Sequence, residues 1–309
     1  MNKMNWRNSI AILVLSISTS TFAQSNLLNA KTPEQIGKKT DAELSADNDK
    51  PLPYGYVHDR DILMGKRIWE YIDIDERVNF PLYYPVEGDV LLTKERQPLY
   101  NVLINGIREG KITEVYDSSY FTTKKTLADI ETSLYTVDTT DAGADVVNED
   151  IEAYRKGEKK LDAEFIRKTE LEASDVNAYK VVGYWYFDKR QGELKYRLLG
   201  ICPVIIDVFS KKDSAAEPEY NELFWVYFPS ARDVLHAAKA FNNRNSAMPF
   251  TFDHMLNARR FSSMIYLEEN VYGDRLIKDY MKENSQMQLL ESDRVKEKIR
   301  DFEQDMWNY

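Results

Sequence analysis

Alternating and clustered apolar residues fill the middle of the chain. Residues 179–187 are rich in β-branched and aromatic side chains, and the polar residues 188–192 follow them as a turn. In residues 193–199, apolar side chains occupy every second position, which is the period of a strand with one buried face. Residues 204–209 and 222–228 continue the series. The pattern predicts an antiparallel β-meander with one buried and one wetter face.

Helical periodicity precedes this meander. The spacing of Ile62, Trp69 and Ile72 predicts a helix that Asp59 or Asp61 caps. That helix must end ahead of the next proline, because the residue before a proline is pushed out of the α region. Three further segments are predicted before the meander: a helix at 98–109, a strand at 112–116 and a helix at 161–172.

Helices also close the chain. We expect them at residues 232–241, at 252–260 with a cap from Thr251 or Asp253, and at 292–307, where apolar residues follow a helical stripe. Helices before and after a sequential sheet are typical of the α+β class. The sequence therefore predicts an α+β fold with a central antiparallel β-meander flanked by N-terminal and C-terminal helices.

The N-terminus has the order of charged, apolar and small residues that a secretory signal shows. Lys3 and Arg7 precede the apolar run 10–17, and Ala23 ends a small-residue motif. We therefore expect residues 1–23 to be a signal peptide that is removed. The sequence holds no second apolar segment long enough to cross a bilayer. A periplasmic protein without its own membrane anchor is the expectation.

Polar composition divides the remaining chain. Residues 24–53 show little apolar periodicity and are expected to form a flexible arm, ahead of a single α+β domain at 54–309. Within that domain, residues 138–152 contain six acids and no base: Asp138, Asp141, Asp145, Glu149, Asp150 and Glu152. A calcium loop is one interpretation, but the alternate-position acids and central glycine of an EF-hand are missing. We favour a mobile, solvated surface loop.

Composition narrows the class of protein. The formal net charge of -10 argues against nucleic acid as a partner, since that function calls for basic stripes. Cys202 is the only cysteine, so no internal disulfide can form, and its apolar neighbours indicate a small buried hydrophobe instead of a reactive thiol. The 20 tyrosines and 5 tryptophans suit extensive interfaces, although they are also ordinary strand residues.

Motifs for catalysis are missing from the sequence. The three histidines fit no metal spacing, and the chain has neither a nucleophile elbow nor a phosphate-binding glycine loop. An acid cluster at 73–76 is either catalytic or, as we prefer, a solvated helix end. Arg259 and Arg260 either bind an anion or, as we prefer, pair with acids or a helix end. We expect no catalytic residue, no cofactor and no metal site.

Several stretches resemble the GldN family of gliding motility proteins, called PorN in non-gliding relatives, of the type IX secretion system. The resemblance runs from about Tyr54 to the C-terminus, and its most family-like stretch reads WEYIDIDERVNFPLYYP. The residues that match there are Trp69, Ile72, Asp73, Glu76, Arg77, Asn79, Pro81, Leu82, Tyr83 and Pro85. Later matching stretches are 223–229 followed by Arg232, 241–245 followed by 251–253, and 260–263 followed by 268–272.

This resemblance implies a structural role. It implies a periplasmic subunit that assembles with an outer-membrane lipoprotein of the GldK/PorK type into a ring and connects with motor proteins of the GldL/PorL and GldM/PorM types. It implies a part in protein export and in the movement of surface adhesins, and it carries no catalytic residues. The stretches direct attention to candidates for fold or interface roles: Trp69, Asn79, Phe80, Pro81, Tyr84, Arg260 and Phe261.

Three functions stay open from the sequence. The first is a ring or scaffold subunit that self-associates and binds the lipoprotein, without direct membrane insertion. The second is a periplasmic module that binds glycan or peptidoglycan on stacking platforms such as Trp185 and Trp225. The third is a glycoside hydrolase whose acid pair cannot be recognised by spacing. We favour the first.

Overall fold

The computed structural model describes residues 50–86, 96–149, 162–206, 220–242, 250–271, 273–282 and 284–307. The expected signal peptide, 1–23, and most of the expected arm, 24–53, lie outside the described residues. Every element described below belongs to one compact unit, Pro51–Tyr309.

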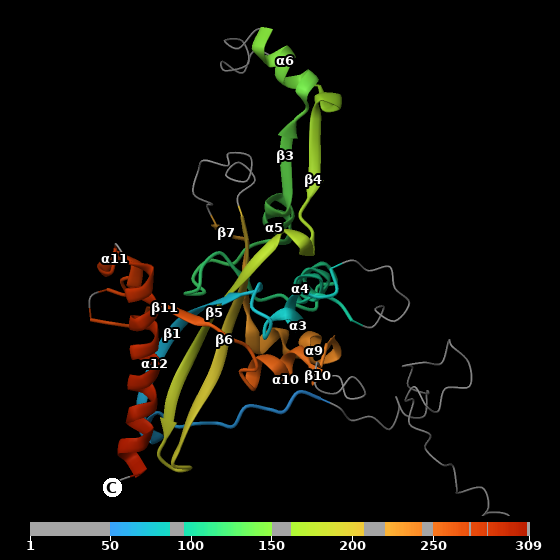
Figure 1. The fold of residues 1–309 in the computed structure, drawn as a ribbon. Helices are drawn as coiled ribbons and strands as arrows, with labels where there is room; N and C mark the ends of the chain where they lie inside the picture. Colours follow the sequence, from blue (N-terminus) through green and yellow to red (C-terminus); the bar gives the residue numbers. More distant parts are fainter. Residues whose placement is uncertain are drawn as a thin grey trace, which may run out of the picture. The chain divides into compact units, whose positions relative to one another are not determined.

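A seven-stranded antiparallel sheet is the centre of this unit (Figure 1). Its strands follow the order β11–β1–β5–β6–β8–β2, and β7 pairs with β6 beside that path. The strands are β1 (Ile62–Asp73), β2 (Val115–Tyr116), β5 (Val176–Asp188), β6 (Glu193–Ile206), β7 (Tyr220–Glu222), β8 (Trp225–Tyr227) and β11 (Met264–Glu268). Two small antiparallel pairs lie outside the sheet: β3 (Tyr135–Thr139) with β4 (Ile166–Glu170), and β9 (Lys239–Ala240) with β10 (Phe250–Thr251).

The long hairpin of β5 and β6 confirms the predicted meander and, with the surrounding helices, the α+β class. Val181 pairs with Ile201 and Trp185 pairs with Tyr196 along this hairpin. The turn between the strands ends at Gly192, whose φ of 65° lies in the left-handed region that glycine adopts without strain. The turn expected at 188–192 is therefore the chain reversal at the end of the sheet.

The helix expected from the spacing of Ile62, Trp69 and Ile72 is wrong, because these residues lie on β1. Ile68, Trp69 and Glu70 are consecutive and all buried. A strand that is covered on both faces loses the alternation of apolar and polar residues. The sequence of β1 therefore shows no strand-like period of two, and its apolar residues fall near helical spacing by chance.

Helices and short 3-10 turns make up the rest of the described structure. The helices are α3 (Phe80–Tyr83), α4 (Leu99–Arg108), α5 (Leu127–Leu134), α6 (Asp141–Glu149), α9 (Phe228–Ala237), α10 (Phe252–Asn257), α11 (Ile277–Tyr280) and α12 (Ser285–Trp307). The 3-10 turns are Asp59–Asp61, Ala163–Phe165 and Ala173–Asp175.

Several predicted helices are confirmed with shifted ends. α4 matches the expected helix at 98–109, and α10 begins where the Thr251 hydroxyl accepts a hydrogen bond from the His254 amide at 3.1 Å. α9 begins before its expected start because Pro229 fits the first helical turn. α12 begins at Ser285, where the Asn284 side chain accepts a hydrogen bond from the Gln286 amide at 3.0 Å.

Two predictions between α5 and β5 are wrong. The segment expected to be a helix at 161–172 contains the short turn Ala163–Phe165 and strand β4. The segment expected to be a loop at 138–152 contains the end of β3 and helix α6 up to Glu149. Pairing of β3 with β4 joins residues that the sequence separates by the whole of α6, and no local pattern encodes such a pairing. The mobility of this segment stays a prediction.

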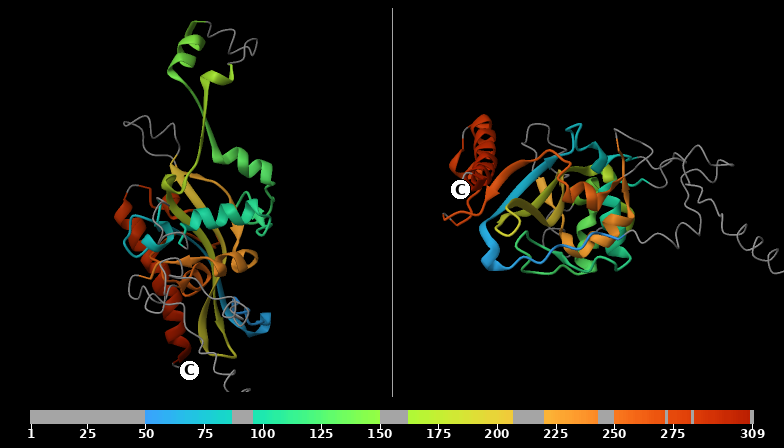
Figure 2. Two further views of the ribbon diagram at one scale, coloured as in Figure 1. Left: turned by 90° about the vertical axis from the view of Figure 1, so that its right-hand side faces the viewer. Right: turned by 90° about the horizontal axis from the view of Figure 1, so that it is seen from below.

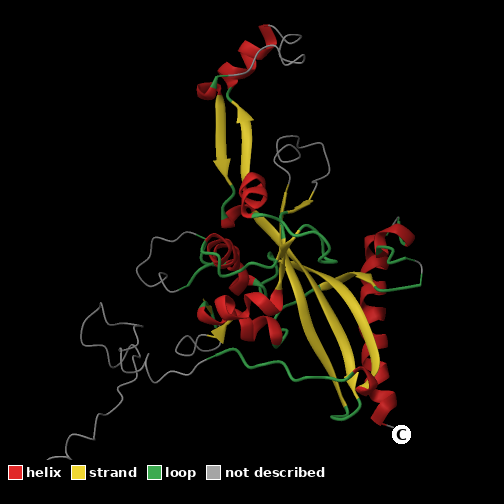
Figure 3. Ribbon diagram, turned by 180° about the vertical axis from the view of Figure 1, so that it is seen from behind, coloured by secondary structure: helices red, strands yellow, loops and turns green. Residues whose placement is uncertain are grey.

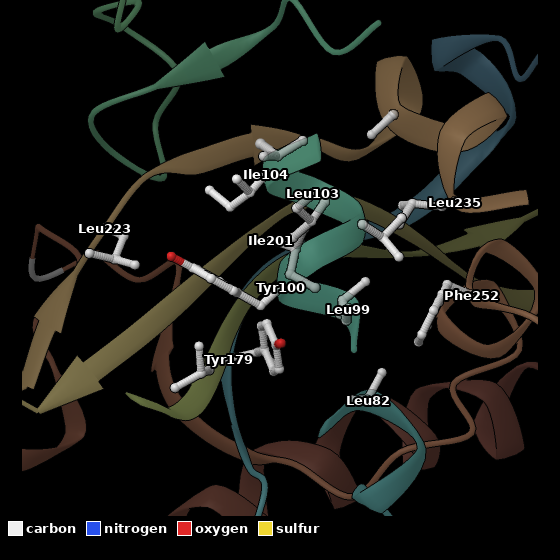
Figure 4. Close-up of a cluster of buried hydrophobic side chains, with 14 of the residues drawn as sticks. Leu82, Leu99, Tyr100, Leu103, Ile104, Tyr179, Ile201, Leu223, Leu235 and Phe252 are labelled. Atoms are coloured by element: carbon white, nitrogen blue, oxygen red, sulfur yellow. The ribbon is translucent and has the colours of Figure 1, made fainter. Parts of the chain in front are cut away.

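One face of the main sheet, which we call the helix face, carries Ile68, Glu70 and Ile72 of β1. Around Ile72 it packs against α3, α4, α9 and α10 in the largest core cluster (Figure 4). Around Ile68 it packs against α12 through Val295 and Ile299. Figure 3 shows α12 apart from the other helices, so the two groups cover separate parts of this face.

The opposite face of the sheet, which we call the loop face, carries Trp69 of β1. Trp69 packs there with Val182, Cys202 and Trp225, and the segment around Tyr120 covers it. The burial of Cys202, which has no exposed surface, confirms the prediction of a small buried hydrophobe. The middle of the sheet around Trp69 is therefore covered on both faces, whereas the first residues of β1 and β6 keep partly exposed side chains.

Candidate interaction surface

Trp69 lies in the core and not at the surface. Its side chain is fully buried on the loop face, and its ring centroid lies 5.5 Å from that of Tyr120. An aromatic side chain of this size contributes mainly through the apolar area that it removes from water. Among the candidates, Trp69 therefore has the geometry of a fold residue.

Asn79 is the second buried candidate, and its side chain connects two distant loops. It donates to the carbonyl oxygen of Asp73 at 2.6 Å and to that of Ser262 at 3.0 Å. It also accepts a hydrogen bond from the Ser262 amide at 2.9 Å. With no exposed surface and three partners, Asn79 fixes the turn that follows β1 against the segment that follows α10.

The residues around Asn79 form a cluster at the surface, which we call the aromatic patch: Val78 and Tyr84 are exposed, and Phe80 and Tyr83 are half-buried. Val78 is 59% exposed and Tyr84 is 51% exposed. The Tyr84 ring meets Phe80 edge-to-face at 5.4 Å and Tyr83 at 4.9 Å. Pro81, from the same short helix α3, is buried beneath them. The turn thus holds apolar and aromatic side chains at the surface on a rigid base.

Arg260 and Phe261 lie in the segment that Asn79 holds, which we call the 258–263 segment. Phe261 is only 8% exposed and belongs to the largest core cluster. Arg260 is exposed, and its guanidinium lies 5.5 Å from the Phe250 ring centroid. The structure brings Asn79 and Phe261 close through Ser262, whereas Trp69 lies on the other face of the sheet.

A buried ion pair beside this segment was not among the candidates. Glu70 has no exposed surface, and both of its oxygens accept hydrogen bonds from Arg259 at 2.7 Å. Ser263 donates to the same carboxylate at 2.8 Å, and Tyr196 donates at 3.3 Å. Arg259 has a φ of 50°, a conformation that few side chains other than glycine adopt. We call this cluster the Glu70 hub.

The surroundings of Arg259 in the Glu70 hub favour its charged form. Burial disfavours the guanidinium of Arg259, but its hydrogen bonds with Glu70 and the charge of Glu70 outweigh this effect and raise its pKa. Burial and the Glu70 charge also raise the pKa of Tyr196 well above its ordinary value. The Arg259 guanidinium lies 4.2 Å from the Tyr196 ring centroid. The hub is complete in itself, and this confirms the preferred interpretation that Arg259 pairs with an acid.

A second ion pair ties the chain's early segment to the helices. Arg232 on α9 donates to both oxygens of Asp253 on α10, at 2.7 and 3.1 Å. Tyr54 packs over the Arg232 guanidinium at 4.2 Å and donates to Asn257 at 2.7 Å. Burial, the largest influence on it, raises the pKa of Tyr54 to about 12. This cluster anchors residues near 54 to the domain.

Reactive chemistry has little support in the described geometry. Burial raises the pKa of the Cys202 thiol well above its ordinary range, which suppresses the nucleophilic thiolate. In the described part of the chain, no group of three or more histidine, cysteine, aspartate or glutamate side chains is placed to hold a metal ion. In the acid cluster at 73–76, Asp73 accepts a hydrogen bond from the Asp75 amide at 2.9 Å. The cluster follows strand β1 as a turn, so the expected helix end is wrong.

The two tryptophans considered as glycan platforms differ in exposure. Trp225 is 1% exposed and donates through Nε1 to Glu222 at 2.7 Å. Trp185 is half-buried, with its ring against Tyr196 at 5.1 Å and Arg259 at 5.1 Å. Stacking a sugar needs an accessible ring face, so the assignment of Trp225 as a platform is wrong.

Comparison with known families supplies the decisive observation. A sequence model of the family described as gliding motility associated protein GldN matches residues 57–308. The chain belongs to the GldN family. A search of curated proteins finds no match. The matched range contains the aromatic patch, the Glu70 hub and the 258–263 segment.

Membership of the GldN family implies a role in gliding motility and the type IX secretion system. GldN proteins are structural components of the gliding machinery and not a known family of enzymes. Among the described residues, no helix combines the length and the apolar character that crossing a bilayer requires.

Proposed function

We propose that this chain is a non-enzymatic periplasmic subunit that forms a ring or core complex with an outer-membrane lipoprotein of the GldK/PorK type. In this role it supports protein export and adhesin movement, alongside motor proteins of the GldL/PorL and GldM/PorM types. The aromatic patch is the surface that contacts the lipoprotein. The observation that carries the proposal is the exposed Tyr84 ring, which lies against the half-buried rings of Phe80 and Tyr83 on a fixed turn, inside the range that the family model matches.

Physical reasons favour the aromatic patch as an interface. Tyrosine and phenylalanine offer large contact areas and lose few rotatable bonds when they are buried by a partner. The Tyr84 ring already lies against two other rings, so its freedom is reduced before binding. Asn79 and Pro81 hold the backbone beneath it. Preorganisation of this kind lowers the entropy cost of association.

The test is to purify residues 24–309 with and without the co-expressed lipoprotein and to record the mass by light scattering and the shape by electron microscopy. We expect a stable co-complex, with arcs or rings. A monomer that is indifferent to the lipoprotein would remove the proposal, and a screen of cell-wall glycans would follow.

Variants of the aromatic patch locate the interface. The double substitution Phe80→Ala and Tyr84→Ala should abolish the co-complex while the variant stays folded. Tyr220→Ala is the matched control, because Tyr220 on β7 is 48% exposed, close to the exposure of Tyr84. Equal loss in both variants, or in neither, contradicts the assignment of this surface.

The compartment has a separate test. The mature protein isolated from the periplasm should begin at Gln24, as cleavage after Ala23 predicts. An N-terminus at Met1 in the cytoplasmic fraction would contradict export.

A further inference from the structure

Strand β1 is longer than the strand that pairs with its outer side. β5 pairs with β1 along its whole length, whereas β11 pairs only with Ile68–Tyr71. The Glu269 amide still donates to the Arg67 carbonyl at 3.0 Å, and beyond this bond the chain turns away from β1. Among the described residues, no strand pairs with the outer side of Ile62–Lys66, which we call the open edge.

The backbone of the open edge points outward at Gly65. Backbone groups of alternate residues point to the same side of a strand, so the amide and carbonyl of Gly65 face away from β5, as the Arg67 carbonyl does. Gly65 is exposed and has no side chain to cover these groups. A Cβ atom there would lie 1.8 Å from the Tyr184 hydroxyl oxygen, which leaves room only for glycine. Unpaired groups at a sheet edge can pair with the backbone of another chain.

Helix α12 continues along the sheet beyond the level of β11 (Figures 1 and 2). Its 23 residues span about 35 Å, whereas the 5 residues of β11 span about 17 Å. Met64, in the open edge, packs against the cluster that includes Ile299 of α12. Further along, the half-buried Phe302 ring lies 5.9 Å from that of Phe187, the residue that pairs with Met64. A strand added to the open edge would continue the line of β11 and face this apolar side of α12 with every second residue.

The loop face beside the open edge carries a cation without a partner. Arg67 lies two residues before Trp69 and therefore on the same face, with its guanidinium 5.9 Å from the Trp69 ring centroid. Within the described residues, Arg67 forms no ion pair, and its buried Nε–H donates to no acceptor. Glu269, its neighbour across the strands, is exposed and does not pair with it. A carboxylate on the loop side of an added strand would lie within reach of Arg67.

We propose that the open edge takes an extended segment of another subunit as an added strand, bound through the backbone of Gly65. Apolar side chains of this segment face α12, and acidic side chains on its other side face Arg67. Two open edges from two copies of this chain do not satisfy each other, because Ile62–Lys66 contains no acid to pair with Arg67. This inference rests on the proposed structural role, but it concerns a surface distinct from the aromatic patch.

The first measurement uses the full chain in cells that assemble the machinery. A photo-crosslinking amino acid replaces Leu63, which lies in the open edge and is 47% exposed, and mass spectrometry identifies the peptide to which it crosslinks. We expect one dominant peptide, from another subunit, in which apolar and acidic residues alternate. Crosslinks to a second copy of this chain, to another part of the same chain, to a peptide without acids, or to nothing above background overturn the proposal.

Charge variants test the role of Arg67. Arg67→Gln should lower the crosslink yield by about tenfold, since charge pairs at interfaces couple strongly. The control is Arg60→Gln, which removes the same charge from a side chain that is 79% exposed just before β1. The control should leave the yield unchanged, and both variants should melt at the temperature of the parent. Equal losses of yield would indicate an effect of net charge alone and overturn the proposal.

Hydrogen exchange of the purified mature chain tests the backbone geometry without a partner. The Gly65 amide should exchange at least about tenfold faster than the Lys66 amide, because the first faces solvent and the second faces β5. The same amide should become protected when the crosslinked subunit is added. Equal protection of the two amides in the isolated chain would mean that the chain covers its own edge, and this result overturns the proposal.

The open edge and the proposed function fail in distinguishable ways. A chain that forms no complex with the lipoprotein, but crosslinks from position 63 to an apolar and acidic segment of another protein, retains the open-edge proposal and loses the ring proposal. A chain that forms the complex but gives no crosslink from position 63 retains the ring and loses the added strand.

Discussion

The stretch from Trp69 to Tyr84 contains two regions with opposite surroundings. Its buried region, Trp69, Glu70 and Asn79, has no exposed surface. Its exposed region includes Val78 and Tyr84, each more than half exposed. Both regions belong to the most family-like part of the sequence. The difference teaches that neighbouring residues of one stretch can differ in what they are available for: the side chains of the buried region are used within the fold, whereas those of the exposed region are accessible to a partner.

The two regions are mechanically related. Asn79 holds the turn through backbone groups of Asp73 and Ser262, and its neighbours Val78 and Phe80 flank it at the surface. A buried side chain that hydrogen-bonds to backbone groups can fix the conformation of a surface turn. The exposed residues beside it are then not required to hold that turn. The predictions below test whether substitutions in the buried region lower the stability of the fold and substitutions in the exposed region lower binding to the partner.

The largest loss of stability is expected for Trp69→Ala. Removing a fully buried indole leaves a cavity beside Cys202 and Trp225, and such changes cost about 3 to 5 kcal/mol of the free energy of unfolding. Urea denaturation measures the loss. Leu63→Ala is the control on the same strand, since Leu63 is 47% exposed and should cost less than about 0.5 kcal/mol. Unchanged melting of the Trp69 variant together with lost partner binding would instead make Trp69 an interface residue.

Breaking the Glu70 hub should have the next largest effect. Glu70→Ala leaves the Arg259 guanidinium without its carboxylate, and the loss of one partner of a buried pair costs about 3 to 5 kcal/mol. We expect the lower end, because the Arg259 side chain is 23% exposed and water can reach it. Replacing both residues with methionine should recover much of the stability, measured in the same urea titration. A double variant no more stable than Glu70→Ala refutes the unpaired-charge explanation.

Asn79→Ala should lower the free energy of unfolding by less than Trp69→Ala or Glu70→Ala. The substitution leaves the Ser262 amide and two carbonyl oxygens without this partner, and each buried unsatisfied group costs about 1 to 3 kcal/mol. Water that enters the turn should reduce the total to about 2 kcal/mol. Thermal unfolding measures the change, with Asn105→Ala on the exposed side of α4 as the control. If Asn79→Ala also abolishes lipoprotein binding, the aromatic patch binds only when Asn79 holds the conformation of the turn.

The elements that the sequence predicted well have one wet face. On β6, Leu194, Tyr196 and Leu198 alternate with charged residues, and the strand period is therefore visible. α4 has an apolar stripe between a proline and a glycine, which mark its two ends. In α10, the Thr251 cap signals the first turn. A helix or strand can therefore be predicted from its own residues when one of its faces is exposed to solvent, because polar and apolar side chains then recur with the period of that element.

The remaining elements depend on contacts that are distant in the chain. β1 is covered on both faces, which erases its alternation, and β4 is a strand only because β3 pairs with it. The Glu70 hub joins residues of β1 to the 258–263 segment across most of the sequence. One signal was available: a single acid within the apolar run Ile68–Ile72 must find a partner when it is buried. The identity of that partner was not encoded locally.

Tyr84→Ala should have the smallest effect on stability and decides whether the exposed region has its own task. The ring is half exposed, so its removal should change the free energy of unfolding by less than about 0.5 kcal/mol. If the ring is an interface anchor, affinity for the lipoprotein should fall by about 2 kcal/mol or more. Tyr84→Phe keeps the edge-to-face contacts with Phe80 and Tyr83 and should retain most of the affinity. Calorimetric titration of the three proteins separates these outcomes: full affinity in Tyr84→Ala would mean that the aromatic patch is surface without a partner, whereas loss only in that variant assigns the contact to the ring.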